Sequence, residues 1–315
     1  MPQLVSILIP CFNAERWVAQ AIESALAQTW PEKEVIVVDD GSKDGSLEII
    51  KSFGHRIRWE SGPNRGGNAA RNRLLELARG EWLQYLDADD HLLPDKVAQQ
   101  MEFLAIHPAT DVVFGPVTLE HCSENGTRRE LLPIPEPHDF WILLARWHLP
   151  QTGASLWRKP AILDVGGWKS DQPCCQEHEL YLRLLMAGKR LDYCPSNGAI
   201  YRQWTTDSVC RRDPRQLHQR TLEILQKERA FLDEREELTT DRLNAINQMR
   251  FTMARGIWKY DRCAAAKIVA DVRQLQPDFR PDSRGCKLSY RILYRCFGFA
   301  TAEQVRARIL ALCQR

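Results

Sequence analysis

The sequence predicts an α/β fold with a mostly parallel sheet flanked by helices, followed by a C-terminal α-helical appendage. Up to about Leu104, short apolar segments alternate with amphipathic ones, which is typical of parallel strands joined by helical crossovers. Two of these apolar segments end in closely spaced aspartates. Beyond about Asp213, glycines and strand-forming residues become sparse and helical patterns prevail. We therefore expect a first domain at residues 1–210 and a helical region at residues 211–315.

The elements of the first half follow in strand–helix order. Val5–Ile9 is a largely apolar run that stops at Pro10, which predicts a buried strand. The stretch from about Glu15 to Gln28 repeats apolar residues at helical spacing and predicts an amphipathic helix. Further strands are expected at residues 34–38, 57–60 and 82–86, and further helices from Ser46 and through residues 74–78.

From Asp111 the pattern becomes mixed. Strands are expected near residues 112–114, 154–157 and 201–204, and helices near residues 140–147, from Pro160 and over residues 176–185. Prolines at about residues 133–137 predict loops. In the C-terminal region, helices with charged outer faces are expected at residues 217–231, 243–258, 263–275 and 302–312.

Composition and charge narrow the class of protein. Hydrophobic residues make up 44% of the chain, which is ordinary for a globular protein, and a net charge of +2 is too small to indicate a nucleic-acid partner. The ten cysteines are scattered without Cys-x-x-Cys spacing, so we expect no disulfide framework. No basic and apolar leader precedes the first strand. We expect a cytoplasmic protein, with the inner face of the plasma membrane as the alternative location.

Acidic residues follow two of the predicted strands. Asp39 and Asp40 end one strand, and Asp87, Asp89 and Asp90 follow another. In an open parallel sheet, ligands bind beyond the carboxyl ends of the strands, so both groups should reach the same edge. Carboxylates this close repel one another unless a cation lies between them, and Mg²⁺ or Mn²⁺ favours such oxygen ligands. A simple role in turns or helix caps is the alternative.

Two further segments carry functional residue types. Residues 64–72 form a glycine turn that leads into a helix, where backbone amides and Arg71 are suited to an anion, although glycine used only for the turn is an equal expectation. Residues 176–185 predict a helix with Glu177 and Glu179 in its first turn, where the helix dipole favours negative charge. The functional alternative for these glutamates is a general base or a contact to a polar substrate.

Taken in order, these segments resemble the family-2 glycosyltransferases over about two thirds of the chain. The matching segments are residues 5–13, 37–46, 64–72, 86–90, 166–168 and 176–184. The resemblance implies the GT-A fold, which is Rossmann-like, and an inverting enzyme that moves a sugar from a nucleotide donor to an acceptor hydroxyl. It also implies a UDP-sugar as donor, a divalent cation (Mn²⁺ or Mg²⁺) as cofactor, and a glycan, a lipid-linked molecule or a protein as acceptor.

The same resemblance implies a pocket for the base of the donor. Asp39 would accept a hydrogen bond from that base, commonly uracil, with Asp40 beside it in the nucleotide site. Pro10, Phe12 and Asn13 would shape the wall of the pocket.

The diphosphate and the metal are assigned in the same way. Arg71 would lie near the diphosphate. Asp87 and Asp89, separated by Ala88, look like the Asp-x-Asp pair of the family. Asp89 would be the more direct metal ligand, and Asp87 would lie nearer the ribose or the water shell of the metal. The division of roles among Asp87, Asp89 and Asp90 stays open at this point.

The resemblance places the catalytic base at Glu177, with Glu179 as a second candidate. The family usually has Glu-Asp here, whereas this chain reads Gln-Glu-His-Glu over residues 176–179. A base on the face opposite the leaving group would take the acceptor's proton during inversion. A further departure is Trp204, where many relatives carry histidine, so any role of that histidine is in doubt here.

Two other functions suit a nucleotide-binding sheet. A sugar-1-phosphate nucleotidyltransferase would carry a glycine-rich basic loop after the first strand, where this chain has Pro-Cys-Phe-Asn at residues 10–13. A non-catalytic subunit that binds a sugar nucleotide or a glycan would keep the pocket without the chemistry. The altered base segment and Trp204 keep this second alternative open.

The helical region has an accessory role in this interpretation, in contact with acceptor, membrane or another subunit. Near its end, apolar residues are interleaved with bases: Lys287, Leu288, Arg291, Ile292, Leu293, Arg295, Phe297 and Phe299. Packing onto neighbouring helices is the simpler expectation for this pattern, and peripheral membrane contact is the alternative.

Overall fold

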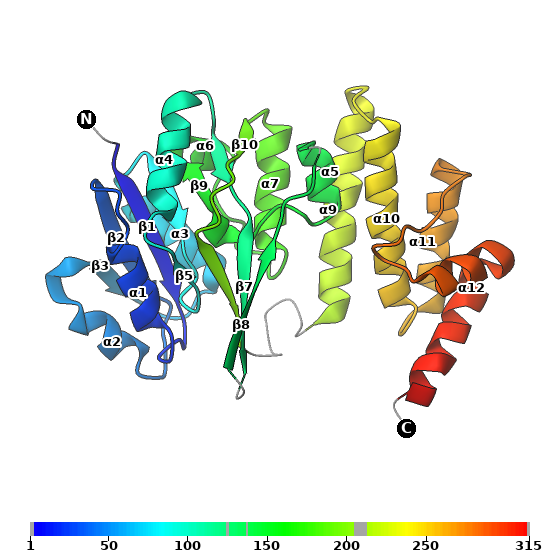
Figure 1. Ribbon diagram of the computed structural model, residues 1–315, viewed down its shortest axis with the longest axis horizontal. Coiled ribbons are helices and arrows are strands. Elements are labelled where there is room, and N and C mark those ends of the chain that lie inside the picture. The colour runs from blue at the N-terminus through cyan, green and yellow to red at the C-terminus, as the bar shows by residue number, and fades with distance from the viewer. Residues whose placement is uncertain (1–2, 124–125, 137, 205–212, 314–315) are drawn as a thin grey trace. The chain divides into compact units, whose positions relative to one another are not determined.

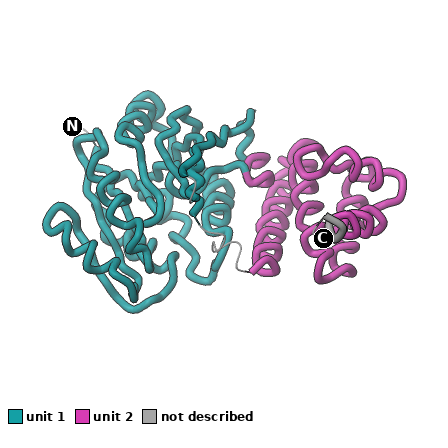
Figure 2. Tube along the Cα trace, turned by 60° about the horizontal axis from the view of Figure 1, so that its bottom comes forward, with its two compact units in different colours: residues 1–140, 148–206 teal, residues 141–147, 207–315 magenta. Residues whose placement is uncertain are grey.

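The structure is a computed structural model that describes residues 3–123, 126–136, 138–204 and 213–313 (Figure 1). The chain divides into two compact units (Figure 2). The first consists of residues 1–140 and 148–206, and the second of residues 141–147 and 207–315. The expected boundary between residues 210 and 211 lies outside the described residues. Residues 141–147 belong to the second unit, which the sequence did not indicate.

The first unit is built on a seven-stranded sheet with strand order β10-β6-β9-β4-β1-β2-β3. The strands are β1 (Val5–Cys11), β2 (Lys33–Asp39), β3 (Arg58–Ser61), β4 (Trp82–Tyr85), β6 (Val112–Phe114), β9 (Ser155–Arg158) and β10 (Leu191–Tyr193). β1 pairs in parallel with both β2 and β4, whereas β9 runs antiparallel to β4 and β6. The expected mostly parallel sheet is confirmed, with β9 as the reversed strand.

Helices flank this sheet, as expected. They are α1 (Val18–Leu26), α2 (Ser46–Ser52), α3 (Gly67–Leu77), α4 (Lys96–Ile106), α6 (Lys159–Asp164) and α7 (Gln176–Met186), with short 3₁₀ turns at Gly54–Arg56 and Thr152–Ala154. Because the crossovers return each chain segment to the same end of the sheet, the carboxyl ends of β1, β2 and β4 share one edge.

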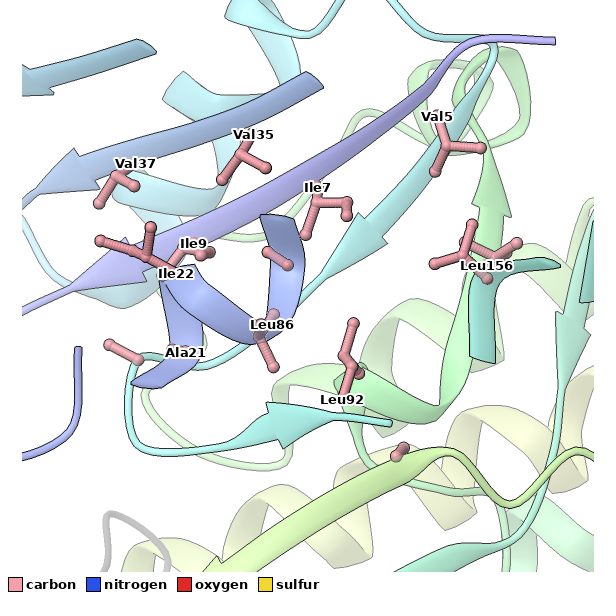
Figure 3. Packing of buried hydrophobic residues seen from close by; sticks show 14 of the residues in the cluster. Val5, Ile7, Ile9, Ala21, Ile22, Val35, Val37, Leu86, Leu92 and Leu156 are labelled. Atoms are coloured by element: carbon pink, nitrogen blue, oxygen red, sulfur yellow. The ribbon is translucent and has the colours of Figure 1, made fainter. Parts of the chain in front are cut away.

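The core lies between the sheet and its helices. Ile7 and Ile9 of β1 lie beside Val35 and Val37 of β2 and pack with Ile22 of α1 (Figure 3). All five side chains are buried. Each such side chain contributes roughly 1.5–3 kcal/mol relative to an exposed one. This packing holds the ends of β1 and β2 rigidly at the edge that carries the acidic residues.

A second sheet of four strands, which the sequence only partly indicated, lies against the first. Its order is β5-β11-β7-β8, with β5 (His91–Leu92), β7 (Val117–Ser123), β8 (Gly126–Leu132) and β11 (Ala199–Gln203). The strand expected near residues 201–204 is β11. The β7–β8 hairpin escaped notice because all of β8 is exposed, so no apolar alternation marks it.

The second unit is helical. Its helices are α5 (Phe140–Ala145), α9 (Pro214–Glu234), α10 (Thr240–Ile257), α11 (Arg262–Leu275) and α12 (Leu288–Cys313). Side-chain oxygens of Asp213, Thr239 and Asp261 cap the starts of α9, α10 and α11. The last helix begins earlier than expected and contains a non-helical residue, Gly298. Within the described part of the chain, no helix has the length and apolar content that crossing a bilayer requires.

The chain makes a close approach at Gly41, just after β2. This glycine has φ +75°, and a Cβ atom there would lie 2.8 Å from the backbone nitrogen of Asn64. Gly54 also has positive φ (+57°), but its Cβ would meet nothing within 4 Å. A substitution at Gly54 therefore measures the free-energy cost of the left-handed backbone alone, whereas one at Gly41 adds the cost of the clash.

We expect Gly54→Ala to lower the free energy of unfolding by about 1–2 kcal/mol, the usual cost of a left-handed backbone. Gly41→Ala should cost at least about 1 kcal/mol more, because backbone must move as well. Urea unfolding followed by tryptophan fluorescence measures both. Equal losses would show that the turn at residue 41 yields without cost.

Candidate functional site

The carboxyl ends of β1 and β2 are held together by short polar contacts. Asn13 has φ +50°, and its Oδ1 accepts a hydrogen bond from the backbone N–H of Lys43 at 2.8 Å. Its own N–H donates to Ser42 Oγ at 2.9 Å. Buried Asp39 accepts from Ser61 Oγ at 2.7 Å and from the Ser42 N–H at 3.3 Å. These hydrogen bonds hold together the residues predicted to form the pocket for the donor's nucleobase.

The other predicted pocket residues differ in their exposure. Pro10 is half-buried at the end of β1, while Phe12 and Asn13 are exposed beside it. Asp40 is buried, and its two oxygens accept the backbone N–H groups of Arg65 and Gly66, each at 2.8 Å. These contacts are those of a residue that shapes the glycine turn before α3. The expected nucleotide contact of Asp40 stays a prediction.

Arg71 of α3 is the most connected side chain of this edge. Its buried guanidinium donates to Asp87 Oδ1 at 2.7 Å, to Gln176 Oε1 at 2.8 Å and to Asn68 Oδ1 at 3.3 Å. It also lies 5.1 Å from the ring centre of Trp168. Burial by itself would lower the pKa of Arg71, but the nearby charges of Asp87 and Glu177 raise it. Arg71 therefore stays charged and joins the loop after β4 to the start of α7.

The loop after β4 carries the three aspartates in different environments. Asp87 is half-buried against Arg71, and Ala88 is buried in the core cluster. Burial and then the charge of Asp87 raise the pKa of Asp89. The indole N–H of Trp204 donates to Asp89 Oδ2 at 3.1 Å. Trp204, at which the sequence departs from the family pattern, thus contacts the expected metal ligand directly.

The third aspartate anchors the loop to the second sheet. Asp90 is buried, and its Oδ1 accepts the backbone N–H of Arg202 on β11 at 2.8 Å. Burial, together with the charges of Asp89 and Asp87, raises the pKa of Asp90 well above its usual value. The Arg202 side chain donates to the backbone oxygen of Asp89 at 2.6 Å and lies 4.2 Å from the Trp17 ring centre. Sequence reasoning missed this role of β11.

These carboxylates fit a hard divalent cation in their chemistry. The pKa values of Asp89 and Asp90 are raised by burial and by neighbouring carboxylates, and a cation would remove that repulsion. No group of three or more His, Cys, Asp or Glu suited to a metal occurs among the described residues. Asp89 and Asp87 would therefore supply one or two ligands, and water and substrate oxygens the rest, as is common for Mg²⁺.

Glu177 lies at the start of α7, facing the same edge. Its Oε1 accepts a hydrogen bond from Thr152 Oγ1 at 2.8 Å. Burial first, and then the charges of Asp90, Asp87 and Glu177, raise the pKa of Tyr201 to about 12. Arg71 donates to Asp87 in the loop after β4 and to Gln176, the residue before Glu177, so the two segments are joined at this edge. The predicted metal acids and the predicted base converge, although about ninety residues separate them in sequence.

Glu179 is in a different situation from Glu177. It is 3% exposed, and Arg183 donates to both of its oxygens through Nε at 3.0 and 2.9 Å. Lys169 Nζ lies 2.6 Å from Oε1 of the same carboxylate. Arg183 in turn donates to the backbone oxygen of Gly167 at 2.7 Å. Glu179 therefore fixes the turn at residues 166–168 against α7, and these contacts favour Glu177 as the base candidate.

Comparison with a family model gives a match. The model described as "Glycosyl transferase family 2" matches residues 6–164, about half of the chain. An uncharacterized glycosyltransferase of Haemophilus influenzae is 34% identical over 145 residues, which cover 45% of this chain and 57% of that protein. The chain thus spans less than two thirds of that relative.

Solved structures with a similar fold extend over most of the chain. The crystal structure of S. aureus TarS in complex with UDP-GlcNAc has a TM-score of 0.60 at 14% identity, covering 88% of this chain and 93% of that one. Mannosyltransferase PcManGT from Pyrobaculum calidifontis, in complex with GDP-Man and Mn²⁺, has a TM-score of 0.55 at 16% identity, covering 100% of this chain and 88% of that one. At these identities the likeness concerns the fold, and it confirms the expected GT-A architecture.

The contacts of the two glutamates predict different effects on stability. Glu179→Gln leaves Arg183 and Lys169 without their shared carboxylate, and should lower the free energy of unfolding by about 3 kcal/mol. Glu177→Gln replaces a charged acceptor of one hydrogen bond by a neutral one. It should change the free energy of unfolding by less than about 1 kcal/mol. Urea unfolding of both variants checks this. Similar losses in the two would contradict the structural role of Glu179.

Proposed function

This chain belongs to glycosyl transferase family 2, and on that premise we propose that it transfers a sugar from a nucleoside diphosphate donor to an acceptor hydroxyl with inversion. UDP-sugar is the proposed donor. The observation that carries the proposal is the pair of hydrogen bonds from Arg71 to Asp87 and to Gln176, which bring the aspartate loop and the start of α7 to one edge. An edge with carboxylates on two sides can bind a metal-bound diphosphate on one and deprotonate an acceptor on the other.

The donor would occupy the edge formed by β1 and β2. Asp39, held by Ser61 and Ser42, presents a fixed carboxylate as acceptor for the imide N–H of a uracil base. Phe12 and Asn13 would form the exposed wall beside it. The nucleotides bound to TarS (UDP-GlcNAc) and to PcManGT (GDP-Man) support a nucleotide sugar at this kind of edge.

The leaving diphosphate would meet Asp87, Asp89 and the cation they hold. A bound Mg²⁺ or Mn²⁺ would offset the charge that develops on the diphosphate as the sugar–phosphate bond breaks. Asp89 is the proposed direct ligand, and Trp204 orients its carboxylate through the indole N–H. Arg71 acts as a positioning residue, because its guanidinium is already bound to Asp87 and Gln176. The Mn²⁺ bound to PcManGT supports the choice of cation.

Glu177 is the proposed general base. Thr152 donates to one of its oxygens and thereby orients the carboxylate, leaving the second oxygen for the acceptor hydroxyl. The proton moves from that hydroxyl to Glu177 as the oxygen attacks the anomeric carbon opposite the diphosphate, which gives inversion. A glycan, a lipid-linked molecule or a protein remains the expected acceptor, and the cytoplasm the expected location.

We expect Glu177→Gln to lower turnover roughly 100- to 10,000-fold, because the amide cannot take the proton. UDP binding should stay within about twofold, since Glu177 does not contact the nucleotide. Release of UDP from UDP-sugars, measured with and without acceptor, checks turnover. Glu48→Gln, at an exposed glutamate of α2, is the matched control. Wild-type turnover in Glu177→Gln would remove the base assignment and leave a binding subunit as the better interpretation.

Asp89→Ala should abolish the cation-dependent part of the thermal stabilisation by UDP. The wild-type protein should melt several degrees higher with UDP and Mn²⁺ than with UDP and chelator, because a ligand that binds only the folded state stabilises it. Asp164→Ala, at an exposed aspartate of α6, should keep this difference. A Mn²⁺-dependent shift that persists in Asp89→Ala refutes the assignment.

Trp204→Phe keeps an aromatic ring but removes the donor to Asp89. The Mn²⁺ concentration that gives half of the UDP-dependent stabilisation should rise about tenfold, as expected for loss of a hydrogen bond to a charged group. Trp59→Phe, at an exposed tryptophan of β3, should leave that concentration unchanged. An equal Mn²⁺ requirement in wild type and Trp204→Phe would mean that Asp89 needs no such support.

A further inference from the structure

The first half of α12 presents aliphatic side chains to solvent. Leu288 is 64% exposed and Ile292 is 54% exposed, and their spacing of four places them on one face of the helix. The opposite side is packed, since Tyr290 and Tyr294 are buried and their rings lie 6.4 and 5.2 Å from that of Phe251. The helix therefore already has its core contacts, and its aliphatic face is additional to them.

The expectation that this aliphatic pattern packs onto neighbouring helices is thus met only in part. The aromatic residues Tyr290, Tyr294 and Phe299 belong to the core cluster of the second unit. Phe297 is 65% exposed, just before the non-helical Gly298. Tyr290, Tyr294 and Phe299 therefore face the core, while Leu288 and Ile292 face outward. Leu293 packs against the core, and Phe297 is exposed on a different side of the helix from Leu288.

Basic residues border the exposed face on one side. Lys287 and Arg295 are exposed, and Arg291, which is partly buried, lies three residues after Leu288 on the same side of the helix. Residues 283–315 contain seven Lys or Arg and one acidic residue, Glu303, whereas the whole chain has a net charge of only +2. Positive charge is therefore concentrated at this end of the chain.

The acidic residue of that stretch does not weaken this charge at the surface. Glu303 is buried, and its two oxygens accept from Arg255 at 2.8 Å and from Arg306 at 2.9 Å. The exposed face of α12 therefore combines aliphatic with basic side chains. An aliphatic face bordered by bases is the pattern of a helix that lies in the interface of an anionic bilayer.

We infer that residues 287–295 form a docking surface for an anionic phospholipid bilayer. Leu288 and Ile292 enter the acyl boundary, while the exposed Lys287 and Arg295 and the partly exposed Arg291 contact the lipid phosphates. The helical part of this segment, residues 288–295, is about 12 Å long, so it lies on the membrane and does not cross it. This inference goes beyond the proposed transfer reaction, because membrane binding requires neither donor nor catalysis.

A second copy of the chain is the other occupant to consider for an apolar face. Two such faces would bring clusters of basic side chains against each other, and their like charges would repel without an acidic partner. A bilayer rich in phosphatidylglycerol has the opposite charge, and its acyl region also accommodates the aliphatic side chains. The charge of the face therefore favours the bilayer.

Cosedimentation of the full chain with vesicles tests the inference. The protein should bind vesicles of equal parts phosphatidylglycerol and phosphatidylcholine at least tenfold more tightly than vesicles of phosphatidylcholine alone. High salt should weaken the binding, because part of it is electrostatic. The double variant Leu288→Ser with Ile292→Ser, and separately the double variant Lys287→Glu with Arg295→Glu, should each reduce binding at least tenfold.

Matched controls separate this surface from general stickiness and from misfolding. Ile106→Ser removes an aliphatic side chain that is 76% exposed on α4, and Lys51→Glu reverses an exposed charge on α2, so both should bind like wild type. Thermal stabilisation by UDP and Mn²⁺ reports on the fold of the first unit, and circular dichroism on the helices of the second. Failure of the transfer reaction alone would leave vesicle binding unaffected.

Three outcomes would overturn the inference. The first is absence of wild-type binding to anionic vesicles. The second is binding that neither double variant reduces. The third is a wild-type dimer, detected by light scattering, that Leu288→Ser with Ile292→Ser converts to a monomer without any effect on vesicle binding. That last result would assign the face to contact between copies.

Discussion

The candidate site depends on one buried cation, the guanidinium of Arg71. It belongs to α3, but its partners come from the loop after β4, from the first residue of α7 and from the turn that carries Trp168. A buried charge without partners costs several kcal/mol, so these segments are held together as a condition of folding. Because the same group fixes Asp87 and Gln176, the acids proposed for the metal and the helix that carries the proposed base are positioned by a single interaction.

The two glutamates of α7 show how neighbouring residues of one type divide between structure and chemistry. Glu179 is buried and bound by two cations, so its charge is used to attach the Gly166–Trp168 turn to the helix. Glu177, two residues earlier, accepts a hydrogen bond from Thr152 and is the carboxylate that we propose as the base. The substitution of Glu for the aspartate common in relatives does not by itself create a second base. Burial and pairing decide which carboxylate is available.

The second sheet has a comparable effect on the metal side. Arg202 on β11 holds the Asp89 backbone and the Asp90 carboxylate, and Trp204 just after it holds the Asp89 side chain. The end of β11 therefore sets the geometry of the aspartate loop, although none of these contacts is local in sequence. Trp204 stands where many relatives carry histidine. Its indole N–H donates a hydrogen bond, whereas a histidine ring could bind a metal directly. The aspartate loop is therefore held at this position by a hydrogen bond from Trp204 to Asp89.

The sequence alone predicted seven of the strands, most of the helices, the mostly parallel sheet and the edge shared by Asp39 and Asp87, while the resemblance to the family added Glu177. It could do so because strand and helix periodicity is local, and because parallel strands bring their carboxyl ends to one side. Only the tertiary structure decided that Asp40 shapes a turn, that Glu179 is neutralised by Arg183, and that Trp204 binds Asp89. It also revealed β8, whose exposed residues carry no periodic signal, and the outward aliphatic face of α12. These features depend on which side chains become buried together across long separations, and no local pattern encodes that.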